Sequence, residues 1–189
     1  MFKNNYKKSD IQDLIKMAQD GNSAALEEFI KKIQKNIFAI FTHLSANRNI
    51  VSDLTQDALV KIAKNITKLK DIKSYKVWMN RIALNVYYDE VRKHSLSEKY
   101  IDYEELENLD IQDESVKPME KCIDDELGCM IKKCILSLPL NSRIAIVLRE
   151  FEGMSYLQIA NLTHTTIGTV KSRISRARVK LQEVLGGYI

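Results

Sequence analysis

The sequence predicts an all-α protein of two small helical domains joined by an acidic flexible linker. Only 6 Gly and 2 Pro occur in 189 residues, which leaves little material for the turns of an all-β fold. Apolar residues recur at steps of three and four over most of the chain, as in amphipathic helices. Residues 95–128 hold 3 Lys and Arg against 12 Asp and Glu, whereas residues 1–94 hold 17 against 10 and residues 129–189 hold 9 against 3.

Residues 1–94 contain the pattern of a four-helix bundle, and we place the first domain there. Ser9 followed by Gln12 predicts a capping box at the first helix, and Gly21 predicts its end. Ser74 is the predicted cap of the fourth helix. The expected helices cover about residues 10–20, 22–41, 52–69 and 74–94, with a loop at 47–50.

Residues 95–118 are the expected linker, because they lack a sustained apolar stripe and end at Pro118. Residues 119–189 form the second domain, with Asn141 predicted to cap its second helix and Ser155 with Gln158 predicted as another capping box. The expected helices cover about residues 119–136, 141–152, 155–162 and 166–185.

The segment from Ser155 to Lys180 has the pattern of a helix-turn-helix, in which the second helix enters the major groove. His164 occupies the turn position where glycine is usual, and histidine is one of the few other residues tolerated at positive φ. A surface helix with solvated basic residues is the alternative interpretation. Around its apolar stripe the last helix presents Thr169, Lys171, Ser172, Arg173, Ser175, Arg176, Arg178 and Lys180. The candidate DNA-binding residues are Thr166, Gly168, Thr169, Lys171, Ser172, Arg173 and Arg176.

A second candidate site is a stripe on the fourth predicted helix. Its members lie three or four residues apart and so share one face; they are Trp78, Arg81, Asn85, Tyr88 and Arg92. Aromatic rings, an amide and arginines suit unpaired bases, because rings stack on bases and arginines hold phosphates. In the alternative interpretation Trp78 belongs to the core and Arg81 pairs with a carboxylate.

The sequence offers little for catalysis. The histidines, His43, His94 and His164, are scattered, and neither a glycine-rich phosphate loop nor a nucleophile with a nearby base is evident. The 3 Cys match no zinc pattern, and we expect reduced thiols. We therefore expect no enzyme, no metal and no cofactor.

The first ten residues are polar and lysine-rich, unlike a signal peptide. No apolar run approaches the roughly 20 residues that span a bilayer. We therefore expect a cytoplasmic protein without membrane insertion.

Together these segments resemble the extracytoplasmic-function (ECF) sigma factors of the sigma-70 superfamily. The segments similar to region 2 of that family are Asp53–Asp57 and Ser74–Asn85. The segments similar to region 4 are Leu136–Pro139 with Arg143, Glu152–Ala160, Ile167–Arg173 and Arg176–Arg178. Their order and separation also match the family.

The resemblance implies an alternative sigma factor that binds core RNA polymerase and promoter DNA and directs transcription initiation. The residues implied to bind core polymerase are Asp53, Leu54, Gln56 and Asp57. The minus-ten element would meet the loop of residues 68–75 and the next helix, at Lys73, Tyr75, Lys76, Trp78, Arg81, Asn85, Tyr88 and Arg92. The predicted helix-turn-helix would bind the minus-thirty-five element, and the family's usual control implies an anti-sigma factor as a further partner.

Two other functions remain open at this point. A helix-turn-helix regulator that acts without core polymerase would explain Ser155–Lys180 but leaves Asp53–Asp57 and the stripe as plain surface. A recombinase or nuclease would need a catalytic set of residues that we do not find in the sequence.

Overall fold

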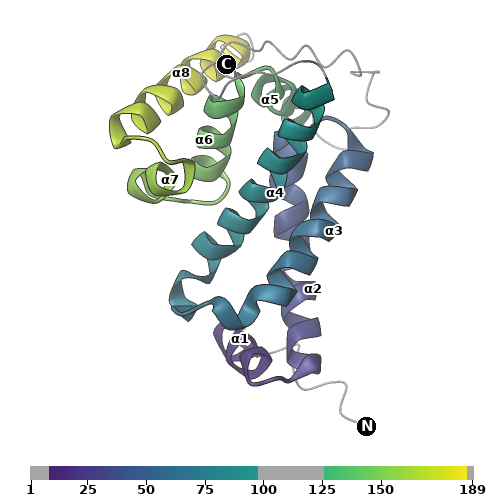
Figure 1. The fold of residues 1–189 in the computed structure, drawn as a ribbon. Helices are drawn as coiled ribbons and strands as arrows, with labels where there is room; N and C mark the ends of the chain where they lie inside the picture. The colour runs from purple at the N-terminus through teal and green to yellow at the C-terminus, as the bar shows by residue number, and fades with distance from the viewer. Residues whose placement is uncertain (1–8, 98–125, 187–189) are drawn as a thin grey trace. The chain divides into compact units, whose positions relative to one another are not determined.

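The computed structural model describes residues 9–97 and 126–186, and every regular element in these two ranges is a helix (Figure 1). Of the described residues, those up to Phe41 together with Asn49–Lys93 form one compact unit. Thr42–Arg48 group with the residues from His94 onward in a second unit. Most of the expected linker, residues 98–118, lies outside the described residues, and residues 95–97 continue the helix before it. The two described ranges, residues 9–97 and 126–186, are called the first and the second block below. None of the described helices is long and apolar enough to cross a membrane.

Within each of the two described ranges the helices follow one another with short connections. In the first block they are α1 (Ile11–Gln19), α2 (Ser23–Leu44), α3 (Arg48–Asn65), the 3-10 turns η1 (Ile66–Lys68) and η2 (Ile72–Ser74), and α4 (Tyr75–Ser97). In the second block they are α5 (Glu126–Leu136), α6 (Leu140–Glu150), α7 (Tyr156–Thr163) and α8 (Ile167–Leu185).

The first unit is built on buried apolar faces of α1 to α4, as the spacing of the sequence predicts. The short helix α1 contacts η1 and η2, so it lies beside the connection between α3 and α4 (Figure 1). Buried members of this core are Leu14, Ile15, Phe29, Ile33, Ile37, Ala58, Ile62, Met79, Ala83 and Val86.

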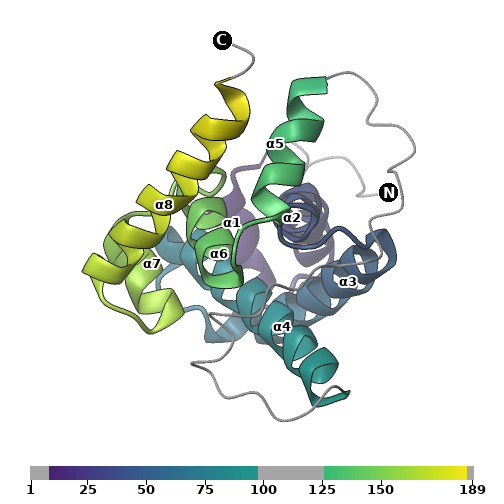
Figure 2. The ribbon, with the colours of Figure 1, turned by 90° about the horizontal axis from the view of Figure 1, so that it is seen from above.

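In the second unit α8 packs against α5, α6 and α7, and α6 also contacts α7 (Figure 2). The apolar stripe predicted for the last helix is buried here, at Val170, Ile174 and Ala177. The two helices of the predicted helix-turn-helix, α7 and α8, therefore rest on a scaffold made by α5 and α6.

Three predicted helix starts differ from the structure by one to four residues. The cap of α1 is Asp10, whose carboxylate accepts a hydrogen bond from the amide of Gln12 at 3.3 Å, so Ser9 is not the cap. The helix α6 begins at Leu140, directly after Pro139, so Asn141 is not its cap. The helix α3 begins at Arg48, within the expected loop at 47–50.

The cysteines also differ from the expectation of three reduced thiols. Cys129 is disulfide-bonded. Cys134 has a free, buried thiol on α5, and its Sγ atom donates to the carbonyl oxygen of Lys180 on α8 at 3.6 Å. Cys122 lies outside the described residues.

Candidate nucleic-acid interface

The stripe predicted on the fourth helix lies on the side of α4 that faces away from the core. Arg81, Asn85 and Arg92 are exposed, whereas Trp78 and Tyr88 are half-buried. Arg81 forms no ion pair with any of the described residues. The alternative interpretation, in which Arg81 pairs with a carboxylate, is therefore not supported. An exposed amide between arginines, with half-buried aromatic residues on the same face, can meet bases and phosphates along one helix face.

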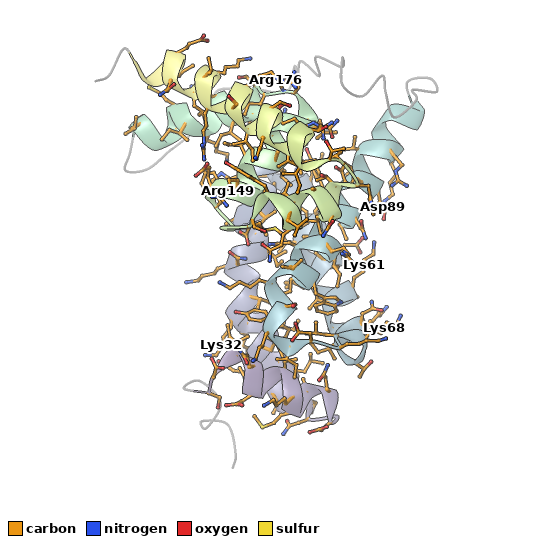
Figure 3. All side chains as sticks on the ribbon, turned by 90° about the vertical axis from the view of Figure 1, so that its left-hand side faces the viewer. Lys32, Lys61, Lys68, Asp89, Arg149 and Arg176 are labelled. Atoms are coloured by element: carbon orange, nitrogen blue, oxygen red, sulfur yellow. The ribbon has the colours of Figure 1, made fainter. Side chains whose placement is uncertain are left out.

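An acidic residue that the sequence reasoning missed lies within this stripe. Asp89 Oδ2 is 3.6 Å from Lys61 Nζ on α3, and its Oδ1 is 3.8 Å from Arg92 Nη1 on α4 (Figure 3). All three side chains are about half exposed, so these ion pairs contribute little to stability. The single negative charge of Asp89 is shared between two cations, one of which, Arg92, belongs to the stripe.

The connection between α3 and α4 carries the other residues predicted to meet the minus-ten element. Asp71 caps η2 by accepting from the amide of Lys73 at 3.0 Å, and it also accepts from the hydroxyl of Ser74. The Ser74 hydroxyl, followed by the Lys73 amide, lowers the pKa of the Asp71 carboxyl below its usual value. Lys73 and Lys76 are exposed and Tyr75 is half-buried. This short, capped segment presents two lysines at the start of α4.

The exposed face of α3 carries the acidic pattern predicted to bind core polymerase. Asp53, Gln56 and Asp57 are exposed and share one side of the helix. Leu54 is different: it is 4% exposed and belongs to the core of the first unit. The surface available to a partner is therefore the two carboxylates and the amide.

The turn between α7 and α8 has the geometry that the sequence predicts. Ser155 and Gln158 form both hydrogen bonds of the capping box, at 3.2 and 2.8 Å. His164 ends α7 in the left-handed conformation, with φ 53 and ψ 40. Thr166 then caps α8, because its hydroxyl oxygen accepts from the amide of Thr169 at 3.1 Å. A helix-turn-helix of this kind fixes the direction in which α8 leaves the domain.

The first half of α8 presents most of the predicted DNA-binding residues to solvent. Thr166, Gly168, Lys171, Ser172 and Arg176 are exposed, and Thr169 is half-buried. The first turn of α8 contains no acidic side chain, so its positive dipole end and backbone N–H groups suit a phosphate.

Two arginines of α8 differ in their placement. Arg176 Nε donates to the carbonyl oxygen of Ser172 at 3.3 Å, which holds its guanidinium over the exposed face. Arg173 is only 8% exposed, because its position lies between the buried positions Val170 and Ala177 on the inner face. Arg173 therefore offers much less surface to DNA than Arg176.

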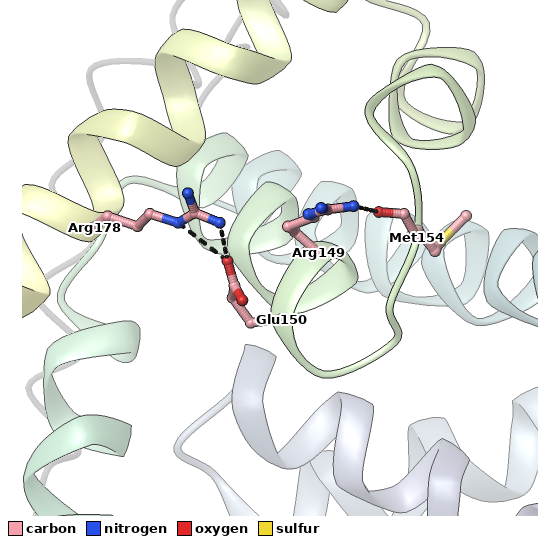
Figure 4. A network of polar contacts seen from close by, with 4 residues as sticks. All are labelled: Arg149, Glu150, Met154 and Arg178. Carbon is pink, nitrogen blue, oxygen red and sulfur yellow. Dashed lines mark hydrogen bonds and ion pairs between the residues drawn. The ribbon is translucent and has the colours of Figure 1, made fainter.

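The position of α8 is supported by polar contacts that the sequence reasoning missed (Figure 4). Arg178 on α8 contacts Glu150 on α6, with Nη2–Oε1 at 2.6 Å and Nε–Oε1 at 3.1 Å. Arg149 Nη1 donates to the carbonyl oxygen of Met154 at 2.8 Å, and its guanidinium lies 4.8 Å from the ring centre of Tyr156. These contacts tie both helices of the helix-turn-helix to α6.

Comparisons with known proteins match the two blocks separately. Residues 29–96 match the family model of sigma-70 region 2. Residues 130–181 match that of sigma-70 region 4. The first match contains the stripe of α4 and the acidic face of α3, and the second contains α7 and most of α8.

Relatives of similar length match over nearly the whole chain. The RNA polymerase sigma-H factor of Pseudomonas aeruginosa is 28% identical over 180 residues, which cover 92% of this chain and 93% of that protein. The ECF RNA polymerase sigma factor SigW of Bacillus subtilis is 28% identical over 181 residues, which cover 93% of this chain and 96% of that protein.

A solved structure also has this fold. It is the sigma factor RpoE in complex with the anti-sigma factor NepR from Bartonella quintana. Its TM-score is 0.68 at 28% identity, and the match covers 85% of this chain and 96% of that chain.

Proposed function

We propose, on the premise that this chain belongs to the sigma-70 family and is an ECF sigma factor, that its two blocks divide the work of promoter recognition. An alternative sigma factor binds core RNA polymerase and directs it to promoter DNA, and this is the function of the chain. The finer assignments below are ours. They place region 2 in residues 1–94, the acidic linker in residues 95–118 and region 4 in residues 119–189.

The proposed contact with core polymerase is the exposed face of α3. Asp53, Gln56 and Asp57 supply two carboxylates and an amide on one side of the helix, a surface that suits basic and polar partner side chains. Leu54 supports that face from the core and is not expected to touch the polymerase.

The proposed minus-ten contacts are the segment of residues 68–75 and the stripe of α4. Asn85 is exposed at the centre of the stripe, with Arg81 one turn before it and Arg92 two turns after it. Capture of an unpaired base costs only its unstacking, a few kcal/mol, and needs no ATP. The observation that carries this proposal is the row of exposed arginine and amide side chains, with half-buried aromatic residues in the same row, within the segment that matches region 2.

The proposed minus-thirty-five contact is the first half of α8, placed in the major groove. Its backbone N–H groups would meet a phosphate near Thr166 and Gly168, and Lys171 would meet another. Arg176 is the proposed base contact, because an exposed arginine can donate two hydrogen bonds to a guanine edge. Arg173 would be a secondary contact at most.

An anti-sigma factor is a further proposed partner, since the Bartonella sigma factor with the same fold is bound to one. We also propose that the chain is cytoplasmic, where core polymerase is found, and that it has no catalytic activity of its own. The acidic linker would keep clear of DNA through charge repulsion.

The decisive experiment is reconstitution with bacterial core RNA polymerase, followed by sequencing of run-off transcripts from sheared genomic DNA. New start sites that depend on the chain would support the proposal and would give both promoter elements. A chain that binds DNA but no core polymerase would instead be a helix-turn-helix regulator, and metal-dependent cleavage of the DNA would indicate a nuclease.

Asn85→Ala tests the assignment of the α4 stripe. We expect a defect in promoter opening with core-polymerase binding unchanged, because Asn85 lies on α4 and the proposed polymerase contacts lie on α3. Permanganate footprinting of the minus-ten region measures opening, and sedimentation with core polymerase measures binding. Loss of polymerase binding would mean that the two faces are wrongly assigned.

A further inference from the structure

The helix α1 lies before the residues that match region 2, yet it contacts the connection between α3 and α4. The side chain of its last residue, Gln19, forms hydrogen bonds to this connection. The side-chain Nε2 of Gln19 donates to the carbonyl oxygen of Ile66 at 2.9 Å and to that of Leu69 at 2.7 Å. These partners are 47 and 50 residues away in the sequence.

The two carbonyl groups mark the place where the chain leaves regular structure. The amide of Leu69 closes η1 by donating to the Ile66 carbonyl oxygen at 3.2 Å, and Leu69 itself has extended backbone. The side chains of both residues are buried, whereas Lys70 and Asp71 beyond them are exposed. Gln19 therefore binds the buried start of the connection between α3 and α4, and the exposed part of that connection follows at Lys70 and Asp71.

Gln19 is itself held firmly. Leu14, Ile15 and Ala18 of α1 are buried, and a tight turn follows in which the amide of Asn22 donates to the carbonyl oxygen of Met17 at 2.9 Å. The backbone that carries Gln19 is therefore fixed against the core, and the two hydrogen bonds hold its side chain. An amide NH2 group has two hydrogens, so both hydrogen bonds can form at once.

We infer that Gln19 is a positioning residue for promoter opening, because it fixes the segment of residues 68–75 in which α4 begins. This inference rests on the proposed minus-ten role of that segment. It makes α1 part of the promoter-opening machinery without direct contact between α1 and DNA.

Gln19→Met tests the inference, since methionine keeps the length and packing of the side chain but cannot donate. Gln12→Met is the matched control, the same change at another half-buried position of the same helix. The first readout is amide hydrogen exchange of the free protein. We expect faster exchange at residues 66–75 in Gln19→Met and unchanged exchange in α3. Faster exchange throughout the first unit would overturn the inference in favour of a general structural role.

The second readout uses the holoenzyme and a labelled single-stranded copy of the minus-ten strand from a promoter found in the run-off experiment. We expect the affinity of Gln19→Met for this oligonucleotide to fall about tenfold, with core-polymerase binding unchanged. Gln19→Glu places a carboxylate against the same carbonyl groups. It should lower the affinity for the oligonucleotide at least as much as Gln19→Met does.

The outcomes distinguish the role of Gln19 from the proposed sigma-factor function on which it rests. If the wild-type chain opens promoters and Gln19→Met opens them equally well, the role of Gln19 is overturned and the function stands. If the wild-type chain opens no promoter, both are overturned.

Discussion

Lys61 Nζ on α3 and Asp89 Oδ2 on α4 lie 3.6 Å apart, so a single carboxylate connects the helix proposed to bind polymerase with the helix proposed to bind DNA. The same carboxylate also lies 3.8 Å from Arg92. Asp89 thus places one negative charge beside two cations, Lys61 and Arg92, at the α4 stripe. We interpret it as a residue that limits non-specific binding.

Asp89→Asn should therefore increase non-specific affinity for single-stranded DNA. Releasing Lys61 from this carboxylate adds up to one phosphate contact, so the slope of log K against log salt should become more negative by about 0.7. The unfolding free energy should change by less than about 1 kcal/mol, because the pairs are half exposed. Fluorescence anisotropy over a salt series measures the slope.

Glu27→Gln is the control for that prediction. It removes the same charge and breaks the ion pair of Glu27 with Lys31 on α2, outside the α4 stripe. An equal change in both variants would show that net charge alone is responsible, which would contradict the role of Asp89.

Arg176 and Arg178 lie two residues apart on α8 but should respond differently to substitution. Arg176→Ala should lower affinity for a minus-thirty-five duplex by about 1–3 kcal/mol if Arg176 contacts a base. Arg178→Ala should have a smaller effect on DNA and cost up to about 1 kcal/mol of stability, because Arg178 is paired with Glu150 at 2.6 Å.

Anisotropy with duplex DNA and chemical denaturation separate these two effects. Both variants lose one positive charge, so a purely electrostatic attraction would weaken equally in the two. That result, or an Arg176→Ala effect that is the same on every DNA sequence, would reduce Arg176 to a phosphate contact.

The sequence predicts the helices and the helix-turn-helix well because both depend on local patterns. The capping box at Ser155, the buried stripe at Val170 and Ile174 and the left-handed turn at His164 are all confirmed. The burial of Arg173 was also within reach, since it lies three residues after Val170 on the same face. An arginine among buried positions departs from the tendency of charged residues to stay at the surface, so charge and position predict opposite placements there.

Long-range polar contacts could not be predicted in the same way. The ion pair of Asp89 with Lys61 and the hydrogen bonds of Gln19 to residues 66 and 69 join helices that are distant in the sequence. No periodic pattern encodes such partners. They depend on how whole helices pack. The polar contacts that hold α4 and the connection before it can therefore be identified only in the structure.

Gly168→Ala should separate the stability of α8 from its binding to DNA. A Cβ atom at this position would meet only Thr166 Oγ1, at an ordinary 3.7 Å, and alanine favours a helix over glycine by up to about 1 kcal/mol. Stability should therefore stay equal or rise. Duplex affinity should fall, because the methyl group occupies the space through which a phosphate approaches the start of the helix.

Denaturation and anisotropy on the same preparation provide the two measurements. A variant that binds minus-thirty-five DNA as tightly as the wild type would mean that the backbone at Gly168 does not approach the duplex. Ser175→Ala, also on α8 but outside the proposed contact set, is a suitable control for effects of the helix alone.

The left-handed conformation of His164 gives the last prediction. At φ 53 and ψ 40 a β-branched side chain is strongly disfavoured, so His164→Val should lower the free energy of unfolding by about 1–3 kcal/mol. His164→Gly should stay within about 1 kcal/mol of the wild type, because relief of strain is offset by the greater freedom of glycine in the unfolded chain. Chemical denaturation at one pH compares all three proteins.

The same pair of variants tests what the turn contributes to DNA binding. His164→Gly keeps the angle between α7 and α8 accessible and should bind duplex DNA much as the wild type does. If valine must move the turn out of the left-handed region, α8 leaves the domain in another direction, and affinity should fall even where the protein remains folded. If His164→Val and His164→Gly had equal unfolding free energies and equal affinities for duplex DNA, residue 164 would not need the left-handed conformation.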